Sequence, residues 1–334
     1  MIKINSRITV ITVFSSIIIM LLVGITSIIT SMYVINKEAT ANLMLLAQNK
    51  VYILEDTFRK IEISTEDLAD YVETTFSIET LNKYGINYLK DYTESMIPLV
   101  KNFTVNTGKV KACYLNFDPE IVKSNKMYEV WVYDKTESGK SFDVITTEPK
   151  STLYPVDKPE LDWFYKPKVT GKPTWSDSFT EEIVYASMIS YTKPVYVQGK
   201  FIGVAGMDIS VEKLKNIILD LKVYETGYAF LLDKNFDMVI HKKYKINEKL
   251  EKINNSLFKS LKKQSAKHKT GIINYHHDNI DKVACYKKLN NGLIFAITVP
   301  KAEILRQKFN LQILITSITL LNIILAVLIM INKE

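Results

Sequence analysis

Two neighbouring pieces of sequence decide the fold of this chain: DWFYKPKVTGKPTWSDSF at residues 162–179 and GKFIGVAGMDIS at residues 199–210. The first joins an aromatic pair to a Gly-Lys-Pro turn, and the second is an apolar strand that ends in an acid. With the acid that follows the first piece, they supply three aromatic side chains and two carboxylates: Trp163, Phe164, Phe179, Glu181 and Asp208. We predict that these side chains form a ligand pocket.

The sequence on both sides of these pieces repeats one order of helices and strands. Strand-like runs lie at residues 110–117, 128–134, 183–197 and 200–209, and a helix is predicted over residues 211–221. The theme then returns in smaller form, with a hairpin at 227–241, an amphipathic helix at 247–263, and strands at 271–276, 282–289 and 293–300. This order predicts two stacked lobes of the α/β (α+β) class.

A long stalk helix is predicted ahead of both lobes. Its apolar positions recur in alternating steps of four and three, as in a heptad seam: Ala47, Val51, Leu54, Phe58, Ile61, Thr65, Leu68 and Val72. The seam either pairs with a second copy of the chain, giving a homodimer, or packs on its own domain, and the sequence favours neither. A second helix follows, and Pro98 is expected to kink or close it.

Two uncharged stretches, residues 8–35 and 309–331, flank the folded part. Roughly 20 apolar residues suffice to cross a bilayer, so we predict two transmembrane helices. A cleaved signal peptide is the alternative for the first stretch, but its apolar part is long and no small-residue cleavage site follows. Lys3, Arg7 and Lys333 flank the spans, which predicts cytoplasmic termini and an extracytoplasmic folded part in the cell membrane.

Composition excludes several classes of protein. The chain has 334 residues with 43 Lys and Arg against 36 Asp and Glu, and this scattered excess does not predict a nucleic-acid partner. Cys113 and Cys285 are its 2 cysteines, and we expect two buried free thiols rather than a disulfide framework.

The sequence also gives no basis for a catalytic site, a metal site or a cofactor. The four histidines are His241, His268, His276 and His277, and none has a metal-ligand partner at useful spacing. The GVAG run at residues 203–206 has no following Gly-Lys-Ser/Thr, and no G-x-S-x-G or H-E-x-x-H motif occurs. We therefore expect a protein that is not an enzyme.

Taken with the stalk and the flanking spans, the motifs at residues 162–179, 193–210, 227–241 and 293–300 closely resemble the double Cache sensor domains of bacterial receptors. The resemblance covers residues 36–300. It implies PAS-like antiparallel sheets, a membrane-distal lobe that holds a small ligand, and a membrane-proximal lobe that transmits through the second span. Such domains head chemotaxis receptors, sensor histidine kinases and membrane-bound diguanylate cyclases.

Amino-acid-binding members of that family are similar to this chain at Trp163, Phe164, Phe179, Glu181 and Asp208. They also carry an Arg two residues before the Trp and a Tyr five residues before that Arg. This chain has Leu161 and Val156 at those positions. Leu cannot supply the charge-assisted hydrogen bonds that clamp a carboxylate, so the departure weakens the amino-acid reading.

The remaining side chains favour a cationic amine as ligand, because aromatic faces attract cations and carboxylates accept hydrogen bonds from an ammonium. Glu160 is predicted as a third acid at the rim, with Tyr185 and Tyr191 as further lining residues that alternatively face solvent. Two structural alternatives stay open: Trp163 lies in the core of the lobe, and Asp208 caps the helix that begins near Val211. Trp175 is expected in the core.

The predicted organisation therefore has eight segments. They are a cytoplasmic tail (1–7), a first span (8–35), the stalk and second helix (36–106), the distal lobe (107–222), the proximal lobe (223–300), an exit helix (301–308), a second span (309–331) and a cytoplasmic end (332–334). The predicted function is a receptor for a small extracellular molecule, with a cytoplasmic signalling module beyond this sequence. Alternatives are a sensor of amino acids or other metabolites, and an anchored solute-binding module that does not signal.

Overall fold

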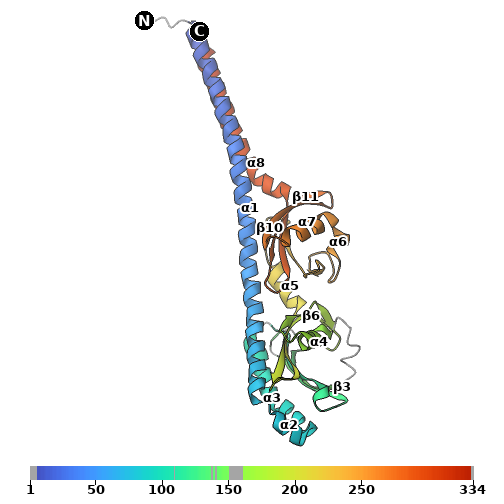
Figure 1. Cartoon of the computed structure of the whole chain (residues 1–334). Coiled ribbons are helices and arrows are strands. Elements are labelled where there is room, and N and C mark those ends of the chain that lie inside the picture. The colour runs from blue at the N-terminus through green and yellow to red at the C-terminus, as the bar shows by residue number, and fades with distance from the viewer. Residues whose placement is uncertain (1–5, 109, 137, 140, 150–160, 332–334) are drawn as a thin grey trace.

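The computed structural model of the chain describes residues 6–108, 110–136, 138–139, 141–149 and 161–331. One helix, α1 (Ser6–Thr75), runs along the whole molecule, and two lobes are stacked on one side of it (Figure 1). The last helix, α8 (Lys301–Ile331), returns alongside the N-terminal part of α1. A Cβ atom built on Gly24 of α1 would lie 3.2 Å from the side chain of Thr319 of α8, so the two helices touch there.

The distal lobe consists of one antiparallel sheet and the helices that pack around it. Among the described residues this sheet has seven strands in the order β3-β2-β1-β7-β6-β4, with β5 paired to β6. Its strands are β1 (Ala112–Phe117), β2 (Lys126–Asp134), β3 (Phe142–Pro149), β4 (Thr174–Trp175), β5 (Phe179–Glu181), β6 (Ala186–Val197) and β7 (Lys200–Ser210). Its helices are α2 (Ile78–Tyr84), α3 (Ile86–Thr107), the 3-10 turn η1 (Pro119–Ile121), α4 (Asp162–Thr170) and α5 (Val211–Leu219).

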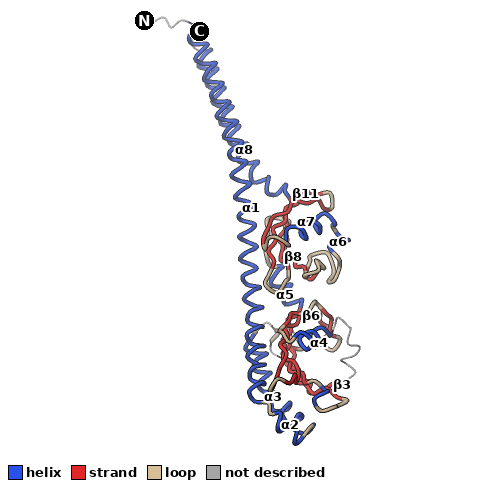
Figure 2. The backbone as a smooth tube through the Cα atoms, in the orientation of Figure 1, coloured by secondary structure: helices blue, strands red, loops and turns tan. Residues whose placement is uncertain are grey.

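The proximal lobe repeats this design with a smaller antiparallel sheet (Figure 2). In the described chain the sheet has five strands in the order β10-β11-β12-β8-β9. They are β8 (Tyr228–Leu232), β9 (Met238–Ile240), β10 (Thr270–His277), β11 (Ile280–Lys288) and β12 (Ile294–Pro300), and α6 (Leu250–Ile253) and α7 (Asn255–Ser265) cover one face. The other face packs on α1, so the predicted pair of lobes is confirmed.

The seam predicted on the stalk helix is buried within this single chain. Each of its positions from Ala47 to Val72 is at most 3% exposed, and its apolar members share a core cluster with residues of both sheets. Because the lobes cover the stripe, it is not free to meet a second copy. Of the two predicted uses of this stripe, the structure shows packing on the chain's own lobes.

Three details of local structure differ from the sequence prediction or complete it. Helix α3 continues through Pro98 to Thr107, so of the two expected effects of Pro98, closure of the helix does not occur. The single helix predicted at 247–263 is two helices, because Asn254 takes an extended conformation and its side chain caps α7 by accepting from the backbone N–H of Leu257. Cys113 and Cys285 are buried free thiols, as predicted.

The predicted membrane spans fall within α1 and α8. Over the residues that the structure describes, none of the helices combines the length and the apolarity needed to cross a membrane.

Truncating the seam tests how strongly the stalk holds the lobes. The Phe58 ring meets the ring of Trp175 edge-on at 5.1 Å, and Phe58 is 3% exposed. We expect Phe58→Ala to lower the free energy of unfolding by about 3–5 kcal/mol, measured by urea denaturation of the full chain. Arg59→Ala, next along the helix on an exposed position, should change it by less than about 0.5 kcal/mol. Equal losses in the two variants would contradict a seam that stabilises the lobes.

Candidate functional site

The candidate site lies on the face of the distal sheet that points away from α1. Side chains alternate along β1: Cys113, Leu115 and Phe117 join the core cluster beneath α1, whereas Ala112 and Tyr114 belong to a cluster on the opposite face. The same alternation holds in the neighbouring strands. The sheet therefore has one face devoted to the stalk and one face free to form a site.

A cavity of about 180 Å³ opens on that second face. Strands β1, β2, β3, β5, β6 and β7 supply most of its lining, and the N-cap and first turn of α4 and the turn between β5 and β6 supply the rest. The lining residues are Tyr114, Asn116, Met127, Glu129, Trp131, Glu148, Leu161, Trp163, Phe179, Thr180, Glu181, Ile183, Met188 and Asp208. Among the residues that the structure describes, the lining thus holds four carboxylic acids and no Lys, Arg or His.

Cross-strand register fixes where two of the acids lie. Asp208 is opposite Ala112 of β1 on one side, and Glu129 is opposite Asn116 of β1 on the other. Between these rows, Tyr114 is opposite both Gly206 and Trp131. The aromatic residues therefore separate the two acids along the sheet.

Gly206 has no side chain, and this leaves room for the Tyr114 ring in the cavity wall. A Cβ atom at this position would lie 2.1 Å from Cζ of Tyr114, so no larger residue fits beneath the ring. The Tyr114 hydroxyl hydrogen-bonds with Oγ of Ser190 at 2.5 Å and Oγ1 of Thr192 at 2.8 Å, and the Trp163 ring meets the Tyr114 ring edge-on at 5.4 Å. These contacts hold the aromatic side chains in place.

Three acceptor oxygens in the lining are buried without a hydrogen-bond partner among the described residues. They are Oδ1 of Asp208, Oε1 of Glu129 and Oδ1 of Asn116. The other oxygen of Glu129 accepts a hydrogen bond of 2.5 Å from Nδ2 of Asn116. A buried acceptor without a donor costs about 1–3 kcal/mol, so the cavity is suited to a group that brings several donors.

Burial shapes the ionisation of these acids. It raises the pKa of Asp208 to about 7, and the negative charge of Glu181 raises it further, while hydrogen bonds with Ser190 and Trp131 oppose the shift. Burial raises the pKa of Glu129 to about 8, with additional repulsion from Glu148 and Glu181. The pKa of Glu181 is also raised, mainly by burial. A cation in the cavity would reverse these shifts by stabilising the carboxylates.

Asp208 does not cap the following helix. The N-cap of α5 is Ser210, whose Oγ accepts a hydrogen bond of 3.1 Å from the backbone N–H of Lys213. Asp208 is 3% exposed and lines the cavity instead. The sequence predicts that Asp208 either lines the pocket or caps the helix, and the structure excludes the capping role.

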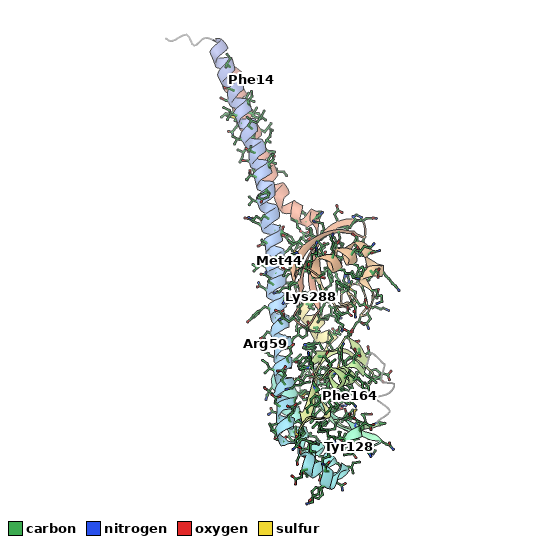
Figure 3. The ribbon with its side chains drawn as sticks, viewed as in Figure 1. Phe14, Met44, Arg59, Tyr128, Phe164 and Lys288 are labelled. Atoms are coloured by element: carbon green, nitrogen blue, oxygen red, sulfur yellow. The ribbon has the colours of Figure 1, made fainter. Side chains whose placement is uncertain are left out.

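The structure brings together Trp163, Phe179, Glu181 and Asp208, together with Leu161. Three other predicted residues lie elsewhere, and Glu160 falls outside the described residues. Phe164, labelled in the distal lobe in Figure 3, is buried there. Its ring packs against Trp163, Tyr165 and Phe201 and does not line the cavity.

The two predicted tyrosines are also displaced from the cavity. Tyr185 is 91% exposed and borders a separate surface hollow with Lys111 and Lys135. Tyr191 occupies the stalk face of β6, where its hydroxyl donates to Oε1 of Glu66 at 2.9 Å. Trp175 likewise packs on α1 and donates to Oε1 of Glu62, which agrees with its expected core position.

Sequence reasoning missed nine of the lining residues, namely Tyr114, Asn116, Met127, Glu129, Trp131, Glu148, Thr180, Ile183 and Met188. A signal existed for one of them. Glu129 is the single acid inside the otherwise apolar and aromatic run YEVWV at residues 128–132, and an acid in such a strand marks either an edge or a site.

Comparison with known proteins gives a consistent result. Residues 34–307 match the sequence profile described as Cache domain. The chain is 22% identical over 207 residues to the methyl-accepting chemotaxis protein PctB of Pseudomonas aeruginosa, covering 60% of this chain and 30% of that protein. It is 22% identical over 160 residues to McpC of Bacillus subtilis, covering 46% and 24% respectively. The matches span less than a third of the length of these relatives.

Solved structures share the fold. The extracellular domain of soHK1S-Z6 aligns with a TM-score of 0.63 at 18% identity, covering 82% of this chain and 98% of that one. The ligand-binding domain of the Campylobacter jejuni chemoreceptor Tlp3, solved with 4-methylisoleucine, aligns with a TM-score of 0.56 at 17% identity, covering 81% and 94%. A further Tlp3 structure holds L-valine.

The raised pKa values of the cavity acids predict how stability depends on pH. From about pH 5 up to about pH 7 for Asp208 and about pH 8 for Glu129, these two carboxyls hold a proton in the folded chain and lose it on unfolding. Raising the pH therefore lowers the free energy of unfolding, by up to about 1.4 kcal/mol per pH unit per group. We expect the melting temperature of the ligand-free chain to fall across this range. Glu129→Gln or Asp208→Asn should flatten the plot of melting temperature against pH. Glu94→Gln, at an exposed position of α3, should not. A curve that Glu129→Gln leaves unchanged would contradict the raised pKa.

Proposed function

The chain belongs to the Cache domain family, and on that premise we propose that it is the ligand-sensing part of a membrane receptor and that it binds a small cationic amine. The family and the fold make it a Cache sensor domain, which is a ligand-binding module. The ligand, the relay of a signal and the placement in a membrane are the proposal.

One observation carries the choice of ligand: over the described part of the chain, the cavity is lined by four carboxylic acids and an aromatic wall, with no basic side chain. A ligand with its own carboxylate would be repelled by Asp208 and Glu129 wherever these are ionised, and it would find no guanidinium at Leu161, which is 9% exposed and apolar. An ammonium finds carboxylate acceptors and ring faces that stabilise a cation by about 0.5–2 kcal/mol per contact.

An amino-acid or other metabolite sensor of the same fold is the second candidate. Tlp3 structures with isoleucine, 4-methylisoleucine and L-valine favour it, because those ligands occupy a domain of the same architecture. An α-amino acid also carries an ammonium group, from which Asp208 could accept hydrogen bonds. The two candidates differ in whether the ligand's carboxylate is tolerated.

The proposed relay runs from the cavity to the proximal lobe through the segment between β4 and β5. Phe179 and Glu181 of β5 line the cavity, and residues of the segment just before β5 contact the other lobe. Asp177 forms an ion pair of 2.7 Å with Lys234, and Oγ of Ser178 donates to Oδ1 of Asn247 at 2.9 Å. A ligand that moves β5 would therefore move these contacts.

The proximal lobe in turn contacts the start of α8. The Glu303 carboxylate accepts hydrogen bonds from the backbone N–H groups of Glu225, at 2.9 Å, and Thr226, at 3.2 Å. Residues 225 and 226 belong to the link between the lobes and come just before β8, whose first residue, Tyr228, is paired with Thr298 near the end of β12. The Glu303 contacts therefore attach the start of α8 to the end of this link that lies away from the distal lobe. In the proposal, a shift of this link displaces α8 and reaches a cytoplasmic module through the second span.

The proposal includes pairing of two copies along α1. The buried seam cannot serve, but Leu45, Tyr52 and Ile63 are 54%, 73% and 49% exposed. At about 100° per residue they share one stripe on the side of α1 opposite the seam. That stripe is the surface on which a second stalk would lie.

Ligand class is tested by thermal shift of the purified full chain against amines, L-amino acids, organic acids and purines. We expect amines to raise the melting temperature, because the folded chain binds the ligand and the unfolded chain does not. Asp208→Asn, which keeps the shape and removes the charge, should abolish the shift, while the charge-matched control Glu94→Gln should retain it. Stabilisation by L-amino acids and not by amines would decide for the second candidate.

The relay is tested by hydrogen exchange at the amides of Glu225 and Thr226. A saturating amine should change their exchange rates in the parent chain. The double variant Asp177→Asn/Ser178→Ala should still bind the amine, but binding should no longer change the exchange rates of these two amides. Asp143→Asn, which breaks the exposed ion pair with Lys135 inside the distal lobe, serves as the matched control. Unchanged exchange in the parent would instead favour an anchored binding module that does not signal.

A further inference from the structure

We propose that the distal cavity takes a diammonium ligand, a chain of methylenes with an ammonium group at each end, and that Asp208 and Glu129 each bind one end. This inference rests on the proposed function, because it specifies which cationic amine the site accepts. It starts from residues that the sequence motifs did not reveal, Glu129 and Asn116 of the paired strands β1 and β2.

The cavity has two acidic ends. The Asp208 end offers the unpartnered Oδ1 of Asp208. The Glu129 end offers the unpartnered Oε1 of Glu129 and Oδ1 of Asn116, with Glu148 close enough that its charge raises the pKa of Glu129. Each end therefore presents buried acceptors that require donors, and an ammonium carries three N–H donors.

The register shows that one ammonium cannot serve both ends. Asp208 lies opposite Ala112 and Glu129 opposite Asn116, four positions further along β1, which is about 13 Å at roughly 3.3 Å per residue. The two acids also lie on opposite sides of β1, two strand spacings or about 10 Å apart. The reach of an Asp and a Glu side chain shortens this span without closing it.

The wall between the ends suits methylenes. Tyr114 and Trp131 occupy the row between Asp208 and Glu129, and Trp163, Leu161 and Met188 line the same cavity. The Tyr114 hydroxyl is already engaged by Ser190 and Thr192, so it offers mainly its ring. An alkyl chain over these side chains buries apolar surface without leaving a polar group unpaired.

Glu181, on β5, acts electrostatically on both acidic ends of the cavity. Its charge raises the pKa of both Asp208 and Glu129, so it lies near each of them. A single ammonium at the Asp208 end would leave the buried acceptors of Glu129 and Asn116 without a donor. A metal ion is a poor alternative, because among the described residues no three acids, cysteines or histidines are grouped closely enough to hold one.

The test compares amines of equal carbon number by isothermal titration of the full chain. Diaminobutane, diaminopentane and diaminohexane are paired with butylamine, pentylamine and hexylamine. We expect at least about tenfold tighter binding for one or more diamines than for its partner, because a second charged hydrogen-bonded contact is gained. The diamine series should also show one optimal length, whereas monoamine affinity should only rise with length.

Glu129→Gln supplies the second arm, since it keeps the shape of the side chain and removes one acidic end. It should reduce diamine affinity to about that of the matched monoamine and leave monoamine affinity within about threefold, with Glu94→Gln unchanged for both. Equal affinity of diamines and monoamines in the parent chain overturns the two-ended site and leaves the amine sensor standing. Failure of every amine to bind overturns both. If Glu129→Gln lowers the melting temperature, the length series in the parent chain still decides.

Discussion

Alternation along β1 is the constraint on which the rest of the molecule depends. One set of its side chains is sealed against the stalk helix, and the other forms the floor of a cavity. Because successive residues of a strand point to opposite faces, neither set can change face without a register slip that would expose the core. The sealed face therefore holds the cavity face in position, and the stalk stabilises the site although it contributes no lining residue.

The cavity keeps its acids at an electrostatic cost. Asp208, Glu129, Glu148 and Glu181 converge where burial already disfavours charge, and Asn116 satisfies only one oxygen of Glu129. Such an arrangement destabilises the ligand-free lobe and is relieved by a cation. A ligand can shift a conformational equilibrium only through its differential affinity for the two states. Repulsion relieved on binding is one source of that difference.

Sequence reasoning reached some parts of this structure and not others for identifiable reasons. The seam from Ala47 to Val72 was predictable because helical period depends on local spacing alone. Trp163, Phe179, Glu181 and Asp208 were reached through motif resemblance. Tyr191 was misplaced because its face depends on the register of β6 with β7, which pairs Ser190 with Asp208 and turns Tyr191 to the stalk. Glu129 and Asn116 meet only through strand pairing, which local sequence does not encode.

The contact between Gly24 of α1 and Thr319 of α8 limits the stroke available to the exit helix. Thr319 occupies a position where its neighbour has no side chain, and one helical turn away in either direction α1 carries Met20 or Ile28. A slide of a full turn, about 5.4 Å, would drive Thr319 into one of those bulky residues. In the proposed relay, α8 would therefore move against α1 as a short piston or by a rotation of less than one turn, and not by a change of helical register.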